Sequence, residues 1–211
     1  MTVDTSVRVG PLRLGTPLIA ASGTVGSVWE FARAAQTDRY GAMVAKSVSE
    51  DAWEGRPPPR LAPVGAGMLN GIGIQNPGIR AWNADTAPRL RRMDTQVWGS
   101  AVGSTPPEFA RVASGLSEAG VAAVEINLSC PNLDGGRMFA LDPESSLQAV
   151  AAVRQAVSLP LGAKLSPNAE DVVAVAQACR EGGADWVTLT NTVWGAGIDI
   201  DSGRPLLSGE V

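Results

Sequence analysis

The segment AAVEINLSCPNLDGG, residues 122–136, predicts a buried strand that ends in a polar, glycine-rich loop. Its first eight residues are a mostly apolar run that becomes polar at Asn127 and Ser129. Runs of this kind are typical of strands buried on both faces of a parallel sheet. Cys130 follows the run and precedes a proline, so it is either a reactive thiol or a small apolar residue that closes the strand.

Five further runs have the same character, with an apolar body and a polar carboxyl-terminal end. Stretches with the periodicity of amphipathic helices separate them, and this alternation predicts a parallel α/β architecture. The predicted strands, including the first, cover residues 17–22, 41–47, 96–103, 122–129, 161–166 and 186–192.

Three helix starts are predicted between these strands. Thr105 and Asp142 each precede a proline, and Asn168 stands three residues before Asp171. Such residues favour the first turn of a helix. Cys179 falls on an apolar stripe of the helix predicted after Asn168, so we expect its side chain to pack in the core.

Repeated βα units allow either an open doubly wound sheet or a barrel. No G-x-G-x-x-G pattern opens a helix after the first strand, and GIGIQNPG, residues 71–78, lies in the wrong context for one. Polar residues end nearly every predicted strand, and barrel enzymes build their sites from that rim. We therefore predict a single α/β domain over residues 1–211, a (β/α)8 TIM barrel with six of its eight units present.

Composition excludes several kinds of site. The 211 residues include no histidine, which removes Ser-His-Asp and Cys-His catalysis and the usual zinc sites, so no metal is expected. A net charge of −4 disfavours a nucleic-acid surface. Two widely separated cysteines and the lack of a long apolar run or signal sequence predict a cytoplasmic protein that is not bound to a membrane.

Polar residues at the strand ends are the candidates for chemistry. Lys46 and Lys164 stand in apolar surroundings, where each ammonium needs either a rim carboxylate or a ligand. Converging asparagine amides would suit a flat ring with alternating C=O and N–H groups, although each alone could be a turn or cap residue. These amides are Asn70, Asn127, Asn132 and Asn191. The long proline- and glycine-rich segment 54–78 is also predicted to be functional.

Six segments together resemble the dihydroorotate dehydrogenase family, flavin-dependent (β/α)8 oxidoreductases of pyrimidine biosynthesis. The resemblance covers essentially the whole chain, and the segments occur in the family's order. They are ASGTVG (21–26), AKSVS (45–49), GMLNGIGIQNPG (67–78), INLSCPN (126–132), KLSPN (164–168) and LTNT (189–192).

The resemblance also indicates a class within the family. With a cysteine at the position of Cys130, the chain resembles the soluble class 1 enzymes, whereas the class 2 enzymes have a serine there. The glycine pair after CPN resembles class 1B, whose catalytic subunit works with an iron-sulfur and FAD subunit that passes electrons to NAD. The resemblance therefore implies an electron-transfer subunit of this kind as a partner. It also implies that the chain assembles as a homodimer or heterotetramer.

The resemblance further implies a role for each matching residue. Cys130 would be the catalytic base that removes the C5 proton of dihydroorotate while a hydride passes from C6 to N5 of FMN. The FMN-binding residues would be Ser22, Gly23, Lys46, Ser47, Ser100, Asn127, Lys164 and Thr190. The residues that bind dihydroorotate or orotate would be Lys46, Asn70, Gly71, Ile72, Gly73, Ile74, Asn127, Asn132, Asn191 and Thr192.

The chain departs from the family pattern in two places. Ser100 stands where the family usually has a flavin-contacting asparagine, so the resemblance implies a shorter or water-mediated hydrogen bond there. The sequence stops at LLSGEV, where the family continues into its last two βα units. We therefore expect the FMN phosphate loops to be missing and two sheet edges to be unpaired.

Two alternatives remain at this point. A dihydropyrimidine dehydrogenase-like flavin barrel shares the NLSCP segment, but it typically has histidine where this chain has Asn132. The other alternative is an inactive, flavin-free fragment or partner subunit.

Overall fold

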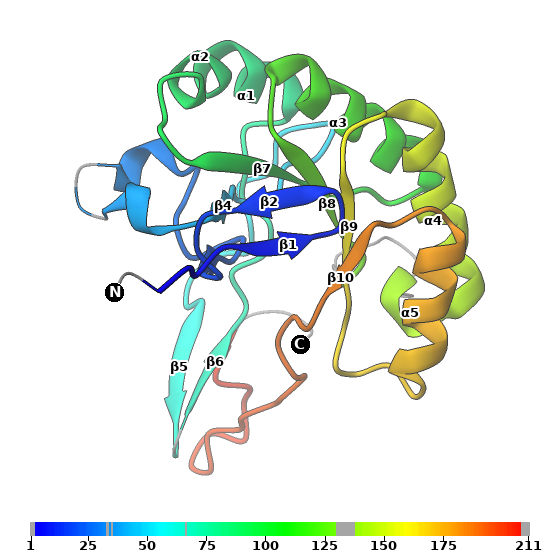
Figure 1. Ribbon diagram of the computed structural model, residues 1–211. Coiled ribbons are helices and arrows are strands. Elements are labelled where there is room, and N and C mark those ends of the chain that lie inside the picture. Colours follow the sequence, from blue (N-terminus) through cyan, green and yellow to red (C-terminus); the bar gives the residue numbers. More distant parts are fainter. Residues whose placement is uncertain (1–2, 33, 35, 66, 130–137, 208–211) are drawn as a thin grey trace.

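The computed structural model describes residues 3–32, 34, 36–65, 67–129 and 138–207. Its centre is a six-stranded parallel sheet in the order β10-β9-β8-β7-β4-β3, curled into part of a barrel (Figure 1). All six predicted strands are confirmed, although each is shorter than its apolar run because the run continues into the rim. They are β3 (Ile19–Ala20), β4 (Ala42–Val44), β7 (Gln96–Ala101), β8 (Ala123–Asn127), β9 (Leu161–Lys164) and β10 (Trp186–Thr188).

Helices cover the outer face of this sheet (Figure 1). The longer ones are α3 (Pro106–Ala119), α4 (Pro143–Ala156) and α5 (Val172–Glu181), and Cys179 of α5 is buried in the outer core as predicted. Two shorter helices precede β7, and single 3₁₀ turns complete the set. These are α1 (Ile79–Asp85), α2 (Ala87–Leu90), η1 (Trp29–Phe31), η2 (Thr37–Arg39) and η3 (Phe139–Leu141).

The helix caps follow the sequence in two cases out of three. The Thr105 hydroxyl accepts from the Glu108 amide at 3.4 Å, and the Asp142 carboxylate accepts from the Ser145 amide at 2.8 Å. The start predicted at Asn168 is wrong. Asp171 caps α5 instead, accepting from two backbone amides at 3.0 and 2.9 Å, because the Asn168 side chain binds other loops of the rim.

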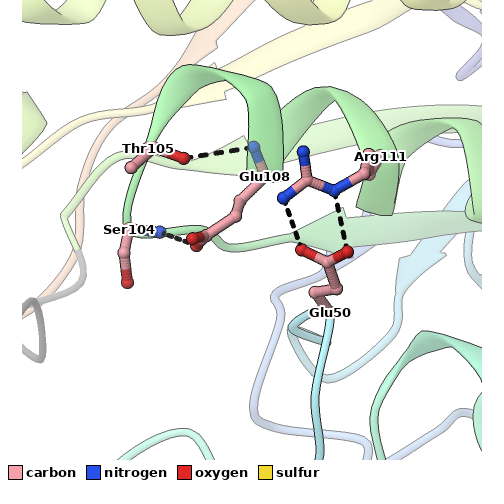
Figure 2. Close-up of polar contacts among 5 residues, drawn as sticks. All are labelled: Glu50, Ser104, Thr105, Glu108 and Arg111. Atoms are coloured by element: carbon pink, nitrogen blue, oxygen red, sulfur yellow. Dashed lines mark hydrogen bonds and ion pairs between the residues drawn. The ribbon is translucent and has the colours of Figure 1, made fainter.

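The amino end of α3 is also tied to the loop after β4 (Figure 2). The Glu108 carboxylate accepts from the Ser104 amide at 2.6 Å, so the first turn of α3 is also bound to the residue before its cap. One turn further along, the Arg111 guanidinium binds both oxygens of Glu50 at 2.7 Å. The Arg111–Glu50 ion pair therefore joins α3 to the loop that leaves the carboxyl end of β4.

Two antiparallel hairpins were not predicted. The strands β1 (Val7–Val9) and β2 (Leu12–Leu14) form the first, which lies over the amino end of the sheet's inner face. The strands β5 (Leu61–Val64) and β6 (Gly67–Asn70) form the second, which projects from the sheet (Figure 1). Among the described residues, no helix is long and apolar enough to cross a membrane.

Candidate active site at the carboxyl end of the sheet

Strand alternation turns a set of polar side chains toward the inner face of the sheet. On β8, Ala123 belongs to the inner apolar cluster, whereas Val124 and Ile126 belong to the outer core. Successive side chains of a strand point to opposite faces, so Glu125 and Asn127 point inward with Ala123. The same alternation places Ser100 of β7 and Lys164 of β9 on the inner face.

A chain of hydrogen bonds links these side chains across the rim. The Ser22 hydroxyl donates to the Ala45 carbonyl at 2.9 Å and lies 3.4 Å from the Ser47 hydroxyl. Ser47 is in turn 2.8 Å from the Ser100 hydroxyl and accepts from the Asn127 amide at 3.4 Å. Four predicted cofactor residues from four different strand ends therefore meet in one hydrogen-bonded cluster, in which Ser22 is half-buried and the other three are buried.

Ser129 extends this network, and sequence reasoning did not single it out. Its hydroxyl donates to Asn127 Oδ1 at 2.8 Å and accepts from Asn191 Nδ2 at 2.6 Å. The two predicted substrate amides Asn127 and Asn191 are thus joined through one serine. The signal was present in the INLSCPN segment, where Ser129 is the second residue after the buried strand.

The two lysines of the chain both lie at this end of the sheet. Lys164 is 8% exposed, yet its ammonium makes no hydrogen bond or ion pair with the described residues. Lys46 is half-buried, and its ammonium lies 3.5 Å from the Gly73 carbonyl. Lys164 therefore forms no ion pair with a rim carboxylate among the described residues, and this observation favours a ligand as its partner.

Glu125 is the second charged group inside the sheet, and sequence reasoning missed it. Its side chain is 2% exposed, and Thr188 Oγ1 donates to its carboxylate at 2.6 Å. Burial raises the pKa of Glu125, while the hydrogen bond from Thr188 and the charge of Lys164 act in the opposite direction. A glutamate in the middle of an otherwise apolar strand was the available signal.

The loop with the predicted substrate residues Gly71, Ile72, Gly73 and Ile74 is held against the loop after β4. Asn76 organises it, accepting from the Ser49 and Gly78 amides at 3.1 and 2.9 Å and donating to the Ile74 carbonyl at 2.7 Å. Gly73 has a φ of 74°, and a Cβ there would lie 2.7 Å from the Trp53 ring. The sequence pattern marked this loop but not the role of Asn76.

Other predicted site residues are exposed and stand outside the buried cluster. Asn70 ends β6 opposite Leu61. Gly23 and Thr190 are exposed at opposite edges of the sheet, and Thr192 donates its amide to Asn191 Oδ1 at 2.9 Å. The predicted base Cys130 and the predicted amide Asn132 lie outside the described residues.

Comparison with known proteins decides the family. The family model for dihydroorotate dehydrogenase matches residues 5–210. This chain belongs to the dihydroorotate dehydrogenase family. The family relatives include the catalytic subunit of dihydroorotate dehydrogenase B (NAD(+)) from Pelobacter propionicus, 44% identical over 99% of this chain and 69% of the relative. The corresponding subunit from Desulforudis audaxviator is 42% identical over 98% of this chain and 68% of its own length.

The solved structures confirm the fold. A dihydroorotate dehydrogenase from Eimeria tenella, crystallised with ferulenol, superposes with a TM-score of 0.74 at 17% identity. The match covers 96% of this chain and 62% of the other, so this chain spans less than two thirds of that family member. The predicted partial barrel, with β3 and β10 at the ends of the sheet, is therefore confirmed.

Proposed function

We propose that this chain provides the active-site face of a class 1B dihydroorotate dehydrogenase, which oxidises dihydroorotate to orotate with FMN as the hydride acceptor in pyrimidine biosynthesis. The observation that carries the proposal is Lys164, a residue only 8% exposed whose ammonium makes no hydrogen bond or ion pair with the described residues. A charge is tolerated in such surroundings when an anionic or electron-rich ligand faces it.

The residues present fit an FMN ring. Lys164 would face its electron-rich edge, and the clustered hydroxyls and amide of Ser22, Ser47, Ser100 and Asn127 offer the donors and acceptors that a flavin ring requires. FMN, when bound, would supply the acceptor for the hydride that leaves C6 of dihydroorotate. Gly23 and Thr190, at the sheet edges, complete the proposed cofactor contacts.

The substrate side of the site rests on Lys46 and the amides. Dihydroorotate carries a carboxylate and ring amide groups, which an ammonium and asparagine side chains recognise. Lys46 already lies against the 71–74 loop, and Asn127 is joined to Asn191 through Ser129. The predicted contacts of Asn70, Asn132 and Thr192 belong to the same proposal.

Cys130 is proposed as the general base. Its Sγ would take the proton from C5 of dihydroorotate, and a thiol is suited to this step because its ordinary pKa of about 8.5 can be tuned toward working pH. The absence of histidine from the chain leaves few other groups for the step. Asn132 favours orotate over the dihydropyrimidine alternative.

The electron acceptor is proposed from the relatives. Those described above are named as catalytic subunits of dihydroorotate dehydrogenase B (NAD(+)). We therefore propose that an iron-sulfur and FAD subunit receives the electrons from this chain's FMN, in an assembly built on a homodimer or heterotetramer. A cytoplasmic location belongs to this proposal.

Visible absorption tests the proposal. FMN is added to the purified chain, unbound FMN is removed by gel filtration, and dihydroorotate is then added without oxygen. We expect a yellow protein whose flavin band bleaches. Cys130→Ala should retain FMN and lose the bleaching, whereas the matched control Cys179→Ala should keep both, because Cys179 is buried in the outer core. A protein that stays colourless contradicts the proposal and supports a flavin-free fragment or partner subunit.

A further inference from the structure

Glu125 is a buried acid that the proposed reaction does not use. Its carboxylate accepts from Thr188 Oγ1 at 2.6 Å, and only 2% of the residue is exposed. Fully buried glutamates are rare unless a partner offsets the loss of hydration. A role in the fold alone would be served as well by an apolar residue of similar size, so the presence of the acid calls for a specific partner.

Lys164 is that partner. In the β8–β9 register, Glu125 stands opposite Gly162 and Asn127 stands opposite Lys164, so the acid and the lysine are diagonal neighbours on the inner face. The charge of Lys164 acts on Glu125, yet the two make no direct ion pair. The carboxylate is therefore close enough to attract the ammonium but too far away to form an ion pair with it, so the ammonium can still bind a ligand.

We propose that Glu125, anchored by Thr188, is a positioning residue that holds a counter-charge behind Lys164 and so sets the electric field that this lysine presents to FMN. This inference rests on the proposed function, because it requires FMN to bind on the side of Lys164 that faces away from Glu125. The neighbours of Glu125 on β7 and β10 are the neutral residues Ser100 and Thr188. Among the described residues, the charge acting on Glu125 comes from Lys164.

The pairing can be tested without cofactor. Carboxyl carbon NMR of glutamate-labelled protein follows the titration of Glu125, whose signal is identified by its loss in Glu125→Gln. Lys164→Met should raise the pKa of Glu125 further, because the cation that favours its ionised form is gone. The carboxyl signal of the exposed Glu181 serves as an internal control and should be the same in both proteins. An unchanged Glu125 titration overturns the proposal.

The effect on FMN is measured as the midpoint potential of the bound flavin at a pH above the Glu125 pKa found in that titration, where its carboxylate is ionised. Glu125→Gln removes a negative charge and should favour reduced, anionic FMN at least tenfold, which is about 30 mV for a two-electron couple. In the Lys164→Met background, Glu125→Gln should cause a clearly smaller shift, because only its direct action on the flavin remains, and Glu181→Gln should change nothing in either background.

Two results count against this role. A potential that Glu125→Gln leaves unchanged, or a shift that is equally large without Lys164, overturns the proposal, because a merely structural residue would affect stability and not the potential in this coupled way. Failure of the unsubstituted chain to bind FMN counts instead against the proposed function. The carboxyl titration then still decides whether Glu125 and Lys164 act as a pair. If Glu125→Gln does not fold, the Glu125 signal is identified by its shift in Thr188→Val, which removes the hydroxyl bound to it.

Discussion

The two ends of the sheet's inner face differ sharply in chemistry. At the amino end, Trp98, Ala123 and their neighbours form a buried apolar cluster that the β1–β2 hairpin covers. At the carboxyl end, Ser100 and Asn127 belong to a hydrogen-bonded cluster beside Lys164. The same strands supply both ends, because Trp98 and Ser100 are separated by a single residue of β7.

This difference assigns separate tasks to the two ends. In barrel enzymes the carboxyl ends of the strands carry the site, and the opposite ends carry stability. A side chain recurs on the same face every second residue, so one step of two residues along β7 leads from tryptophan packing to a serine hydrogen bond. Substitutions at the amino end should therefore lower stability, and substitutions at the carboxyl end should mainly weaken binding.

The largest expected effect is at Trp98. Its ring is buried, and its centroid lies 4.9 Å from that of the Trp186 ring. Trp98→Ala therefore leaves a cavity where the side chains of β7 and β10 meet. We expect a loss of about 3–5 kcal/mol in the free energy of unfolding, measured by urea denaturation. Trp194→Ala, at a half-exposed tryptophan, should cost no more than about 0.5 kcal/mol. Equal losses in the two variants would contradict the assignment of stability to the amino end.

A smaller effect is expected from adding a methyl group at the same end. A Cβ on Gly162 would lie 2.2 Å from the Trp186 ring, so Gly162→Ala forces that ring to move. The expected cost is about 1–3 kcal/mol of unfolding free energy, again from urea denaturation. Gly15→Ala is the matched control, because a Cβ at Gly15 meets no atom within 4 Å. If the two variants unfold at the same urea concentration, the result contradicts close packing of Gly162 against the Trp186 ring.

Much of this arrangement could be predicted because it follows from local patterns. The six apolar runs identify the strands, and strand ends of a parallel sheet meet at one edge, which brings Ser47, Ser100 and Asn127 together. Thr105 and Asp142 have the local sequence of helix caps, and both act as caps.

The remainder depends on contacts between distant segments or on strands too short to recognise in the sequence. Asn168 resembles a helix cap locally, but its amide is engaged by Ser166 and Thr192, and the helix begins only after Asp171. The two hairpins pair short strands whose runs are too brief to stand out. In the sequence Glu125 is only a polar exception in an apolar run. Its role depends on Lys164 and Thr188, which the fold brings close to it.

At the carboxyl end, Ser100→Ala should separate binding from stability. It removes the hydroxyl that lies 2.8 Å from Ser47, and we expect a loss of about 0.5–1.5 kcal/mol in unfolding free energy. Ser146→Ala removes a buried hydroxyl that donates to the Phe139 carbonyl at 2.8 Å, so its cost in stability should be similar. Fluorescence titration with FMN should show weaker binding for Ser100→Ala alone. Equal FMN affinities would break the proposed division of tasks.

The smallest effect is expected at the thiol of the outer core. Burial raises the pKa of Cys179 to about 11, so at about pH 8, three units lower, only about one molecule in a thousand carries the reactive thiolate. Labelling of native Cys130→Ala with a thiol reagent should therefore be very slow at that pH. Its rate should rise about tenfold per pH unit up to about pH 10, because higher pH deprotonates the thiol.

Unfolded protein provides the reference for this labelling. There the thiol has an ordinary pKa of about 8.5, and Cys179 should react rapidly at about pH 8. In the native unsubstituted chain, a fast-reacting thiol should then be Cys130, which follows the Ser129 end of the polar network in the sequence. Rapid labelling of native Cys130→Ala at about pH 8 would show that the outer core opens at α5, and the expected contrast between a protected Cys179 and a reactive Cys130 would no longer hold.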